Sequence, residues 1–229
     1  MASFKKGGKI KDFQKFVQDV YLLPNDRVYA SIWSLLTQKQ RFVMRALKGV
    51  RKGDKDIIKM NLLISFSWFM SVCNKLHIDI EDVIWARFPR VCSYCGNCPC
   101  ACKTKKVIKR KNISASKKIR PKSLKDFQKM FDDIYPASKR TITKAGVHLA
   151  EETGEVAEAM DNYFGQHTEK QFKHICLELA DFCSCFFGLA NSAHFDVEDE
   201  LVKICKNNCH VCHKAPCMCS FEDVMKFRV

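Results

Sequence analysis

The hydrophobic positions along the chain follow the spacing of α-helices. In the second half, apolar residues recur every three or four positions in "KDFQKMFDDIY" and in "HLAEETGEVAEAMDNYF". The segment "EKQFKHICLELADFCSCFFGLANSA" is long and strongly apolar, which is typical of a helix in the middle of a bundle. "DVEDELVKICKNN" begins with an acidic first turn and predicts a fourth helix. Because no segment clearly alternates apolar and polar residues as a half-buried strand does, the sequence predicts an all-α fold.

The two halves of the chain repeat each other. "DFQK" occurs at residues 12–15 and 126–129, and "NKLHIDIED" at 74–82 aligns with "NSAHFDVED" at 191–199. The cysteine pattern C-x2-C-x4-C-x-C follows "NKLHIDIED" in the first half and "NSAHFDVED" in the second. Similarity at a nearly constant offset indicates an internal repeat. We therefore expect two tandem helical bundles, each ending in a cysteine knuckle.

The charge divides the chain into three segments. The net charge is +14, of which residues 1–102 carry +9 and residues 126–229 carry −6. Between these two repeats, residues 103–125 contain 11 Lys or Arg residues and no acidic residue. This basic linker has no apolar periodicity and repels itself, so we expect it to be exposed. It is either a solvated tether or a contact with the phosphates of a nucleic acid, and the sequence leaves both roles open.

The sequence predicts a soluble protein of the cytoplasm. The first ten residues, "MASFKKGGKI", are basic but contain no apolar signal-peptide core. The longest apolar stretch, near "LLISFSWFMSVC", is about half as long as a bilayer crossing requires. We therefore expect no association with a membrane.

Fourteen cysteines indicate either a disulfide framework or metal sites. The absence of an export signal, and a chain long enough to fold without disulfide staples, favour metal. In each repeat, four thiolates within eleven residues suit tetrahedral Zn²⁺, with an iron–sulfur cluster as the alternative. The predicted ligands are Cys92, Cys95, Cys100 and Cys102 in the first repeat and Cys209, Cys212, Cys217 and Cys219 in the second, with Cys98 or His213 as substitutes.

The second repeat contains two pairs of closely spaced acids. Glu152 and Glu155 lie three residues apart on one predicted helix. Glu178 and Asp181 repeat that spacing within the apolar segment "ICLELADFCSCFF", where an unpaired carboxylate is costly to bury. On adjacent antiparallel helices the two pairs can converge on one cation, and ligation by oxygen alone selects Mg²⁺ or Mn²⁺. The sequence therefore predicts a divalent metal site.

These acids resemble the signature of a known family. "EETGE" followed by "ELAD" is similar to the EExxE…ExxD pattern of the MazG-like all-α nucleoside triphosphate pyrophosphohydrolases, and "KICKNN" resembles the Lys…Lys-Asn element that often follows it. The resemblance extends from about Ser123 to Asn208. It implies Mg²⁺-dependent hydrolysis of an NTP or dNTP between the α and β phosphates, which yields the monophosphate and pyrophosphate. The cysteine knuckles are not part of the usual family pattern.

The resemblance also implies a role for each matching residue. The implied metal ligands are Glu152, Glu155, Glu178 and Asp181. Glu151, next to the first of them, is expected to orient or deprotonate the attacking water. The residues expected to reach the phosphates are Lys144, Lys203 and Asn207.

The first repeat lacks this signature. The alignment places Gln38, Arg41, Asn61 and Ile64 opposite the four implied metal ligands. Because none of the four is a carboxylate and one is a cation, we expect the first repeat to be degenerate and only the second to be catalytic. Members of the family assemble as dimers or tetramers of such bundles. The resemblance therefore implies a pseudodimer within the chain, or a homo-oligomer.

A non-enzymatic function is the alternative. The basic linker and the cysteine knuckles are also typical of a zinc-binding adaptor that holds RNA or DNA. The charge and the cysteines support this adaptor, whereas the complete set of acids in the second repeat favours the enzyme.

Overall fold

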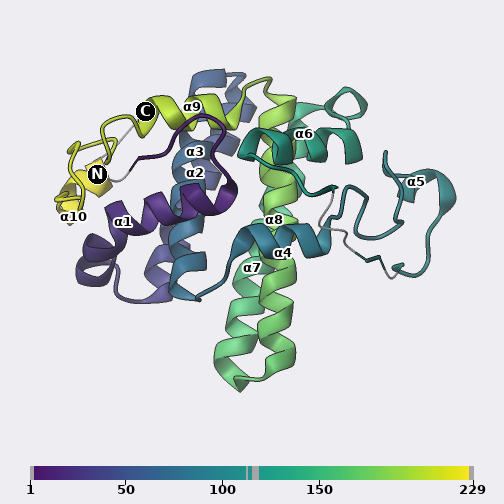
Figure 1. The fold of residues 1–229 in the computed structure, drawn as a ribbon, viewed down its shortest axis with the longest axis horizontal. Helices are drawn as coiled ribbons and strands as arrows, with labels where there is room; N and C mark the ends of the chain where they lie inside the picture. Colours follow the sequence, from purple (N-terminus) through teal and green to yellow (C-terminus); the bar gives the residue numbers. More distant parts are fainter. Residues whose placement is uncertain (1–2, 112, 115–118, 227–229) are drawn as a thin grey trace. The chain divides into compact units, whose positions relative to one another are not determined.

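The computed structural model describes residues 3–111, 113–114 and 119–226, and every regular element in these residues is a helix (Figure 1). The prediction of an all-α fold is confirmed. The helices gather into two compact units. Within the described residues, unit 1 takes the chain up to Asp79 and again from Phe195, and unit 2 takes Ile80–His194.

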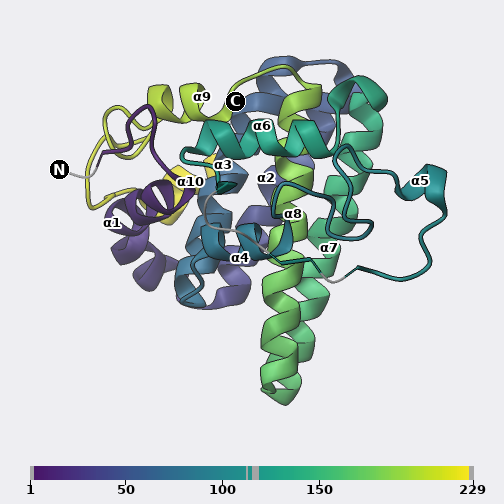
Figure 2. The same ribbon diagram turned by 45° about the vertical axis from the view of Figure 1, so that its right-hand side comes forward.

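Unit 1 is built on a pair of long helices. Its elements are α1 (Ile10–Val28), α2 (Ile32–Lys52), α3 (Lys55–Lys75), α9 (Val197–Ile204) and α10 (Phe221–Lys226). Helices α2 and α3 lie side by side (Figures 1 and 2). The first of them ends at Gly53, whose φ of 69° favours glycine, and Asp54 caps the second. Stacked rings of Phe13 and Phe66 lie in the core between α1 and α3.

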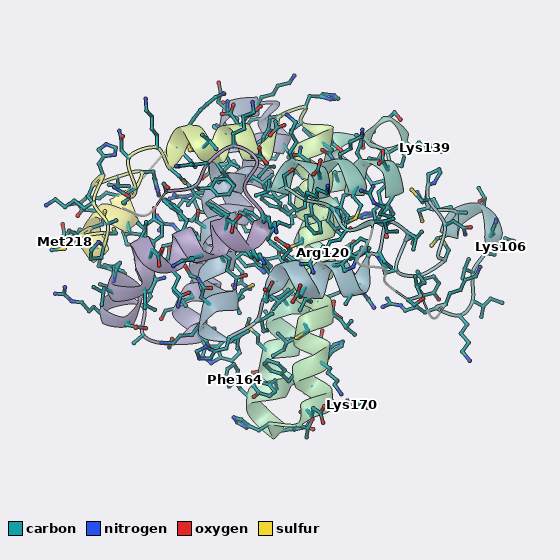
Figure 3. The ribbon with its side chains drawn as sticks, in the orientation of Figure 1. Lys106, Arg120, Lys139, Phe164, Lys170 and Met218 are labelled. Atoms are coloured by element: carbon teal, nitrogen blue, oxygen red, sulfur yellow. The ribbon has the colours of Figure 1, made fainter. Side chains whose placement is uncertain are left out.

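Unit 2 is built on a helical hairpin. Its elements are α4 (Ile80–Arg87), α5 (Cys102–Lys105), α6 (Leu124–Ile134), the 3₁₀ turn η2 (Ala137–Lys139), α7 (Ile142–Gln166) and α8 (Glu169–Ser192). Helices α7 and α8 run antiparallel, and Phe164 and Lys170 lie at the end where they join (Figure 3). Helices α4 and α6 pack against α8, where Phe131 stacks on Phe187. The hairpin carries all of the acids predicted to bind metal.

Two helices, α3 and α8, are long and apolar enough to cross a membrane by length and composition. In their most apolar windows, 67% and 61% of the residues are buried inside the structure. Such burial is typical of the core helices of a soluble bundle.

Each compact unit combines segments of both sequence repeats. Helix α4, which belongs to the first repeat, packs against α8 in unit 2, and α9, which belongs to the second, packs against α3 in unit 1. A backbone bond recurs in both units: Cys100 donates its N–H to the carbonyl of Ile134 at 2.8 Å, and Cys217 donates to that of Val20 at 2.8 Å. The compact units therefore do not follow the predicted boundaries at residues 102 and 126, because the fourth helix and the knuckle of each repeat lie with the bundle of the other.

Two ion pairs at matching positions, one in each unit, show the same exchange of segments between the repeats. In unit 1, Lys6 pairs with Asp199 at 2.9 Å, and in unit 2, Arg120 pairs with Asp82 at 2.5 Å. Each pair joins a basic residue that precedes the first helix of one repeat to an acid in the first turn of the fourth helix of the other. The same connection is made twice within one chain, in opposite directions.

Candidate active site

The α7–α8 hairpin brings three of the four predicted metal ligands together. One carboxylate oxygen from each of Glu152, Glu178 and Asp181 lies within 4.8 Å of the others. The two acids of α8 share one helical face because they are three residues apart. These three residues are called the carboxylate cluster below.

The carboxylate cluster is short of positive charge. Burial raises the pKa of Glu152 to about 8, and the charges of Asp181, Glu155 and Glu178 add to the effect, while Arg87 partly offsets it. One carboxylate oxygen of Glu152, Oε2, is buried and has no hydrogen-bond partner. Acids in this state favour the binding of a cation, and a site made of oxygen atoms fits a hard divalent ion.

The other two predicted acids of α7 lie near the cluster but not in it. Glu155 and Glu151 are both exposed. After burial and Asp181, the charge of Glu155 is among the causes that raise the pKa of Glu178. Glu155 is therefore close enough to act on the cluster electrostatically, although it is not one of the three grouped acids.

A histidine that the sequence analysis did not identify pairs with the cluster. His174 Nε2 lies 3.0 Å from Glu178 Oε1. The two residues are four positions apart on α8, so helical spacing alone could have indicated the contact. His174 is half exposed, at 52% of its side-chain surface.

An arginine that the sequence analysis did not identify also contacts the cluster. Arg87, at the end of α4, donates Nε–H to Asp181 Oδ1 at 3.1 Å and Nη2–H to Oδ2 at 2.5 Å. The pair is bidentate, which is the strongest form of arginine–carboxylate contact. Because α4 belongs to the other sequence repeat, a family signature read within the second repeat could not include Arg87.

A second, half-buried arginine lies against α8. The guanidinium of Arg140 lies on Gly188, where an added Cβ would come within 2.8 Å of Nη1. Its Nε and Nη2 atoms are buried without hydrogen-bond partners, and burial lowers the pKa of the side chain. Gly188 follows Asp181 by two helical turns, so both residues lie on one face of α8. A buried guanidinium with unused donors favours an anion as its partner.

The predicted phosphate-binding residues are divided between the two units. Lys144 is exposed in the first turn of α7, in unit 2, beside Lys103, which lowers its pKa. Lys203 on α9 and Asn207 after it belong to unit 1, where Lys203 donates to Glu200 at 2.6 Å. Of the three predicted residues, only Lys144 shares a compact unit with the carboxylate cluster.

The counterpart positions of the first repeat hold no acidic cluster among the described residues. Arg41 donates to the carbonyl of Met225 in α10 at 2.8 Å. Ile64, the counterpart of an aspartate in the cluster, lines an apolar pocket with Phe42 and Trp68. None of the counterpart positions offers a carboxylate to a divalent cation.

The eight cysteines predicted to bind zinc form two groups, one in each unit. Knuckle 1, in unit 2, consists of Cys92, Cys95, Cys100 and Cys102, and knuckle 2, in unit 1, consists of Cys209, Cys212, Cys217 and Cys219. In knuckle 1 the sulfur atoms lie 3.6 Å apart for Cys92 and Cys102 and 4.0 Å apart for Cys95 and Cys100. In knuckle 2 the distance is 3.8 Å both for Cys209 and Cys219 and for Cys212 and Cys217. Four sulfur atoms at about 2.3 Å from a tetrahedral Zn²⁺ lie about 3.8 Å apart. Cys98 and His213 are exposed and belong to neither group.

Backbone N–H groups point at the knuckle sulfurs in the same way in both units. Cys92 Sγ accepts from the N–H of Tyr94 at 3.4 Å, and Cys209 Sγ accepts from that of Val211 at 3.4 Å. Such donors favour the thiolate, which is the form that binds a metal. No disulfide joins any of the fourteen cysteines, all of which lie within the described residues.

The described part of the basic linker is attached to unit 2 at both ends. Arg110 lies over the ring of Tyr94, and Arg120 pairs with Asp82. Lys106 is exposed at the end of α5 (Figure 3). Part of the linker is therefore ordered on unit 2, and these contacts favour neither of its two predicted roles.

One comparison with known proteins gave a match. Residues 140–214 match the model of the MazG nucleotide pyrophosphohydrolase domain. The matched segment contains the whole carboxylate cluster and continues through α9 into knuckle 2. Neither the curated proteins nor the solved structures compared with the chain gave a match. The match supports nucleotide pyrophosphohydrolase activity in general and confirms the resemblance found in the sequence. Residues 140–214 are therefore similar to the MazG nucleotide pyrophosphohydrolase domain.

Proposed function

We propose that the chain hydrolyses a nucleoside triphosphate, either an NTP or a dNTP, to the monophosphate and pyrophosphate at the carboxylate cluster. The observation that carries this proposal is the meeting of Glu152, Glu178 and Asp181 from two adjacent helices, within the segment that matches the MazG domain. The unpartnered oxygen of Glu152 supports it, because a buried carboxylate without a donor favours a cation.

The residues of the cluster fit Mg²⁺ or Mn²⁺. Carboxylates offer only oxygen ligands, which these hard cations prefer. A triphosphate is itself strongly negative, so it would be repelled by the acids alone. Glu152, Glu178 and Asp181 would hold the divalent ion, which would supply positive charge for the phosphates and lower the pKa of the attacking water.

The acids of α7 and α8 would act according to their positions. The three residues of the carboxylate cluster hold the cation. Glu155, exposed but close enough to act on their charges, is proposed to complete the set of ligands. Glu151, also exposed on α7, is proposed to orient the water or accept its proton.

Positive charge for the phosphates is available in unit 2. Lys144 is exposed in the first turn of α7, where the helix N-terminus also favours anions. The half-buried Arg140 has two nitrogen atoms without partners. The proposed role of Lys203 and Asn207 stays a prediction, because both residues belong to unit 1.

The proposal is tested by pyrophosphate release. Purified protein is incubated with Mg²⁺ and each of the common NTPs and dNTPs, and pyrophosphate is measured. We expect release from at least one of them, and its loss in Glu178→Gln and Asp181→Asn. Glu158→Gln is the matched control, because Glu158 is exposed on α7 outside the cluster. No release from any nucleotide, or full activity in Glu178→Gln, would contradict the proposal.

We also propose that each knuckle binds one Zn²⁺ in a structural role. The sulfur–sulfur distances and the backbone donors support tetrahedral coordination by four thiolates. Metal analysis should find two zinc ions per chain, and Cys95→Ser should lower this to one. Cys98→Ser is the control, since Cys98 is exposed and outside knuckle 1. Iron with visible absorption in place of zinc would instead indicate an iron–sulfur cluster.

A further inference from the structure

The carboxylate cluster is contacted by a cation from outside the segment that matches the MazG domain. The guanidinium of Arg87 forms its two hydrogen bonds with Asp181 where the side chains are only 9% and 18% exposed. The contact is thus a largely buried, bidentate ion pair with a proposed metal ligand.

A buried ion pair is weak evidence of a stabilising role. Taking two charges out of water often costs more free energy than their attraction returns, and apolar side chains of similar volume serve a core equally well. Here Asp181 also lies beside Glu152 and Glu178, so the acids outnumber the arginine that contacts them. A functional role for these charges therefore explains the arrangement better than a stabilising role does.

The residues on both sides of Arg87 hold it in place in unit 2. Before it, Arg120 pairs with the buried Glu81 at 2.8 Å. After it, the ring of Phe88 packs edge to face on Phe131, with the centroids 5.2 Å apart. The guanidinium is therefore positioned by the fold of unit 2 and not by Asp181 alone.

We propose that Arg87 binds the phosphates of the substrate, so that the degenerate repeat supplies a substrate-binding cation to the carboxylates of the other repeat. This inference rests on the proposed function. A guanidinium has five N–H donors and the contact with Asp181 uses two, which leaves donors for phosphate oxygens. Without substrate, the same group holds Asp181 at the cluster. Arg87 thus fills, within unit 2, the role that the resemblance assigned to Lys203.

The test compares Arg87→Gln and Arg87→Lys with a matched control, Arg90→Gln. Arg90 is exposed three residues further on and donates to the carbonyl of Ile119. We expect Arg87→Gln to raise KM roughly tenfold to a hundredfold, as for the loss of a charged hydrogen bond, with a smaller change in kcat. Arg87→Lys should recover part of this loss, since lysine keeps the charge but not the planar fork. Arg90→Gln should behave like the wild type.

A purely structural role for Arg87 gives a different result. In that case Arg87→Gln lowers the melting temperature and the active fraction, while the KM of the remaining active protein equals that of the wild type. This outcome would overturn the inference. If Arg87→Gln does not fold, Arg87→Lys decides in the same way, and an unchanged KM in that variant would overturn the inference too.

Binding of a nucleotide analogue separates this inference from the proposed function. The probe is an α,β-methylene triphosphate with Mg²⁺, which cannot be cleaved between the α and β phosphates, and calorimetry measures its Kd. If the wild type releases no pyrophosphate but binds the analogue more tightly than Arg87→Gln, the proposed function fails and the role of Arg87 stands. Equal binding by the two proteins, or no binding by the wild type, would overturn the role of Arg87.

Discussion

At the scale of single residues, the site gathers acids whose burial and mutual repulsion raise the pKa of Glu152 and of Glu178. Glu152 is half-buried beside three other acids, which add to the rise that burial causes in its pKa, and Arg87 partly offsets this rise. We therefore expect the protonation of Glu152 to be linked to the binding of a metal. A proton or a divalent ion can satisfy the cluster, and the two compete.

The stability of the metal-free protein should depend on pH through Glu152. In the unfolded chain its pKa is about 4.3, whereas in the folded protein it is raised to about 8. The folded state therefore binds the extra proton between these values, so the free energy of unfolding should fall as the pH rises from about 4.5 to about 8. Melting temperatures measured across this range, in protein dialysed free of Mg²⁺ but keeping its zinc, test this.

Glu152→Gln is the control for this pH dependence, because glutamine cannot ionise. Its melting temperature should change less over the same interval. Saturating Mg²⁺ should have a similar effect on the wild type, since the cation replaces the proton. Parallel pH profiles for the wild type and Glu152→Gln would show that this acid is not the cause.

Part of this site could be predicted from the sequence. Glu178 and Asp181 were identifiable because carboxylates in an apolar helix need a partner, and their spacing places them on one face. Arg87 was not identifiable, because it lies 94 positions away from the aspartate that it contacts. Arg140 precedes α7 as one of many basic residues, and only its burial without partners distinguishes it.

At the scale of elements, the short helix α4 and knuckle 1 link the first repeat to the chemistry of the second. Helix α4 packs against α8 and carries Arg87 to the cluster, and knuckle 1 follows it and bonds to the end of α6 through Cys100 and Ile134. Zinc in knuckle 1 would stabilise this segment, so its effect on hydrolysis would be indirect.

Loss of knuckle 1 should therefore impair hydrolysis more than loss of knuckle 2. We expect Cys95→Ser, in unit 2, to lower kcat/KM by roughly tenfold or more, because small displacements of positioned groups carry large penalties. Cys212→Ser, the matched change in unit 1, should have a smaller effect. Steady-state kinetics with parallel zinc analysis measures both. An equal or larger loss in Cys212→Ser would contradict this prediction.

The helices themselves could be predicted, but not their partners. Apolar spacing identified the long helices because a 3.6-residue period is a local property. Helices α4 and α9 each pack with the bundle of the other repeat, and tertiary contacts decide this pairing. The two repeats resemble each other in the segments involved. No local pattern distinguishes the two alternatives, so the predicted boundaries followed the repeats.

At the scale of the whole molecule, we propose a pseudodimer in which one chain supplies both partners. The contacts of Lys6 with Asp199 and of Arg120 with Asp82 support this, because each joins the segment before the first helix of one repeat to the fourth helix of the other. In this proposal the two repeats have diverged from each other. One copy keeps the acids, and the other keeps the helix and the knuckle that complete the first.

The basic linker should bind nucleic acid in a salt-dependent way if it is more than a tether. Replacing the exposed Lys105, Lys106, Lys109 and Lys111 with glutamine should then weaken binding of a short duplex in gel-shift assays. The slope of log affinity against log salt should decrease by about three to four. The matched control replaces Lys48, Lys52, Lys129 and Lys139, which are exposed elsewhere. Equal binding by both variants would show that the linker is only a tether.

The central claim is that acids of α7 and α8 meet around a divalent cation, and Mn²⁺ binding followed by electron paramagnetic resonance tests it most directly. Zinc-loaded protein is titrated with Mn²⁺, which prefers oxygen ligands and so reports on the carboxylates and not on the knuckles. The account predicts saturable binding by the wild type and by Glu158→Gln, and its loss in Asp181→Asn and Glu178→Gln. Equal Mn²⁺ binding by all four proteins, or none by the wild type, would contradict it.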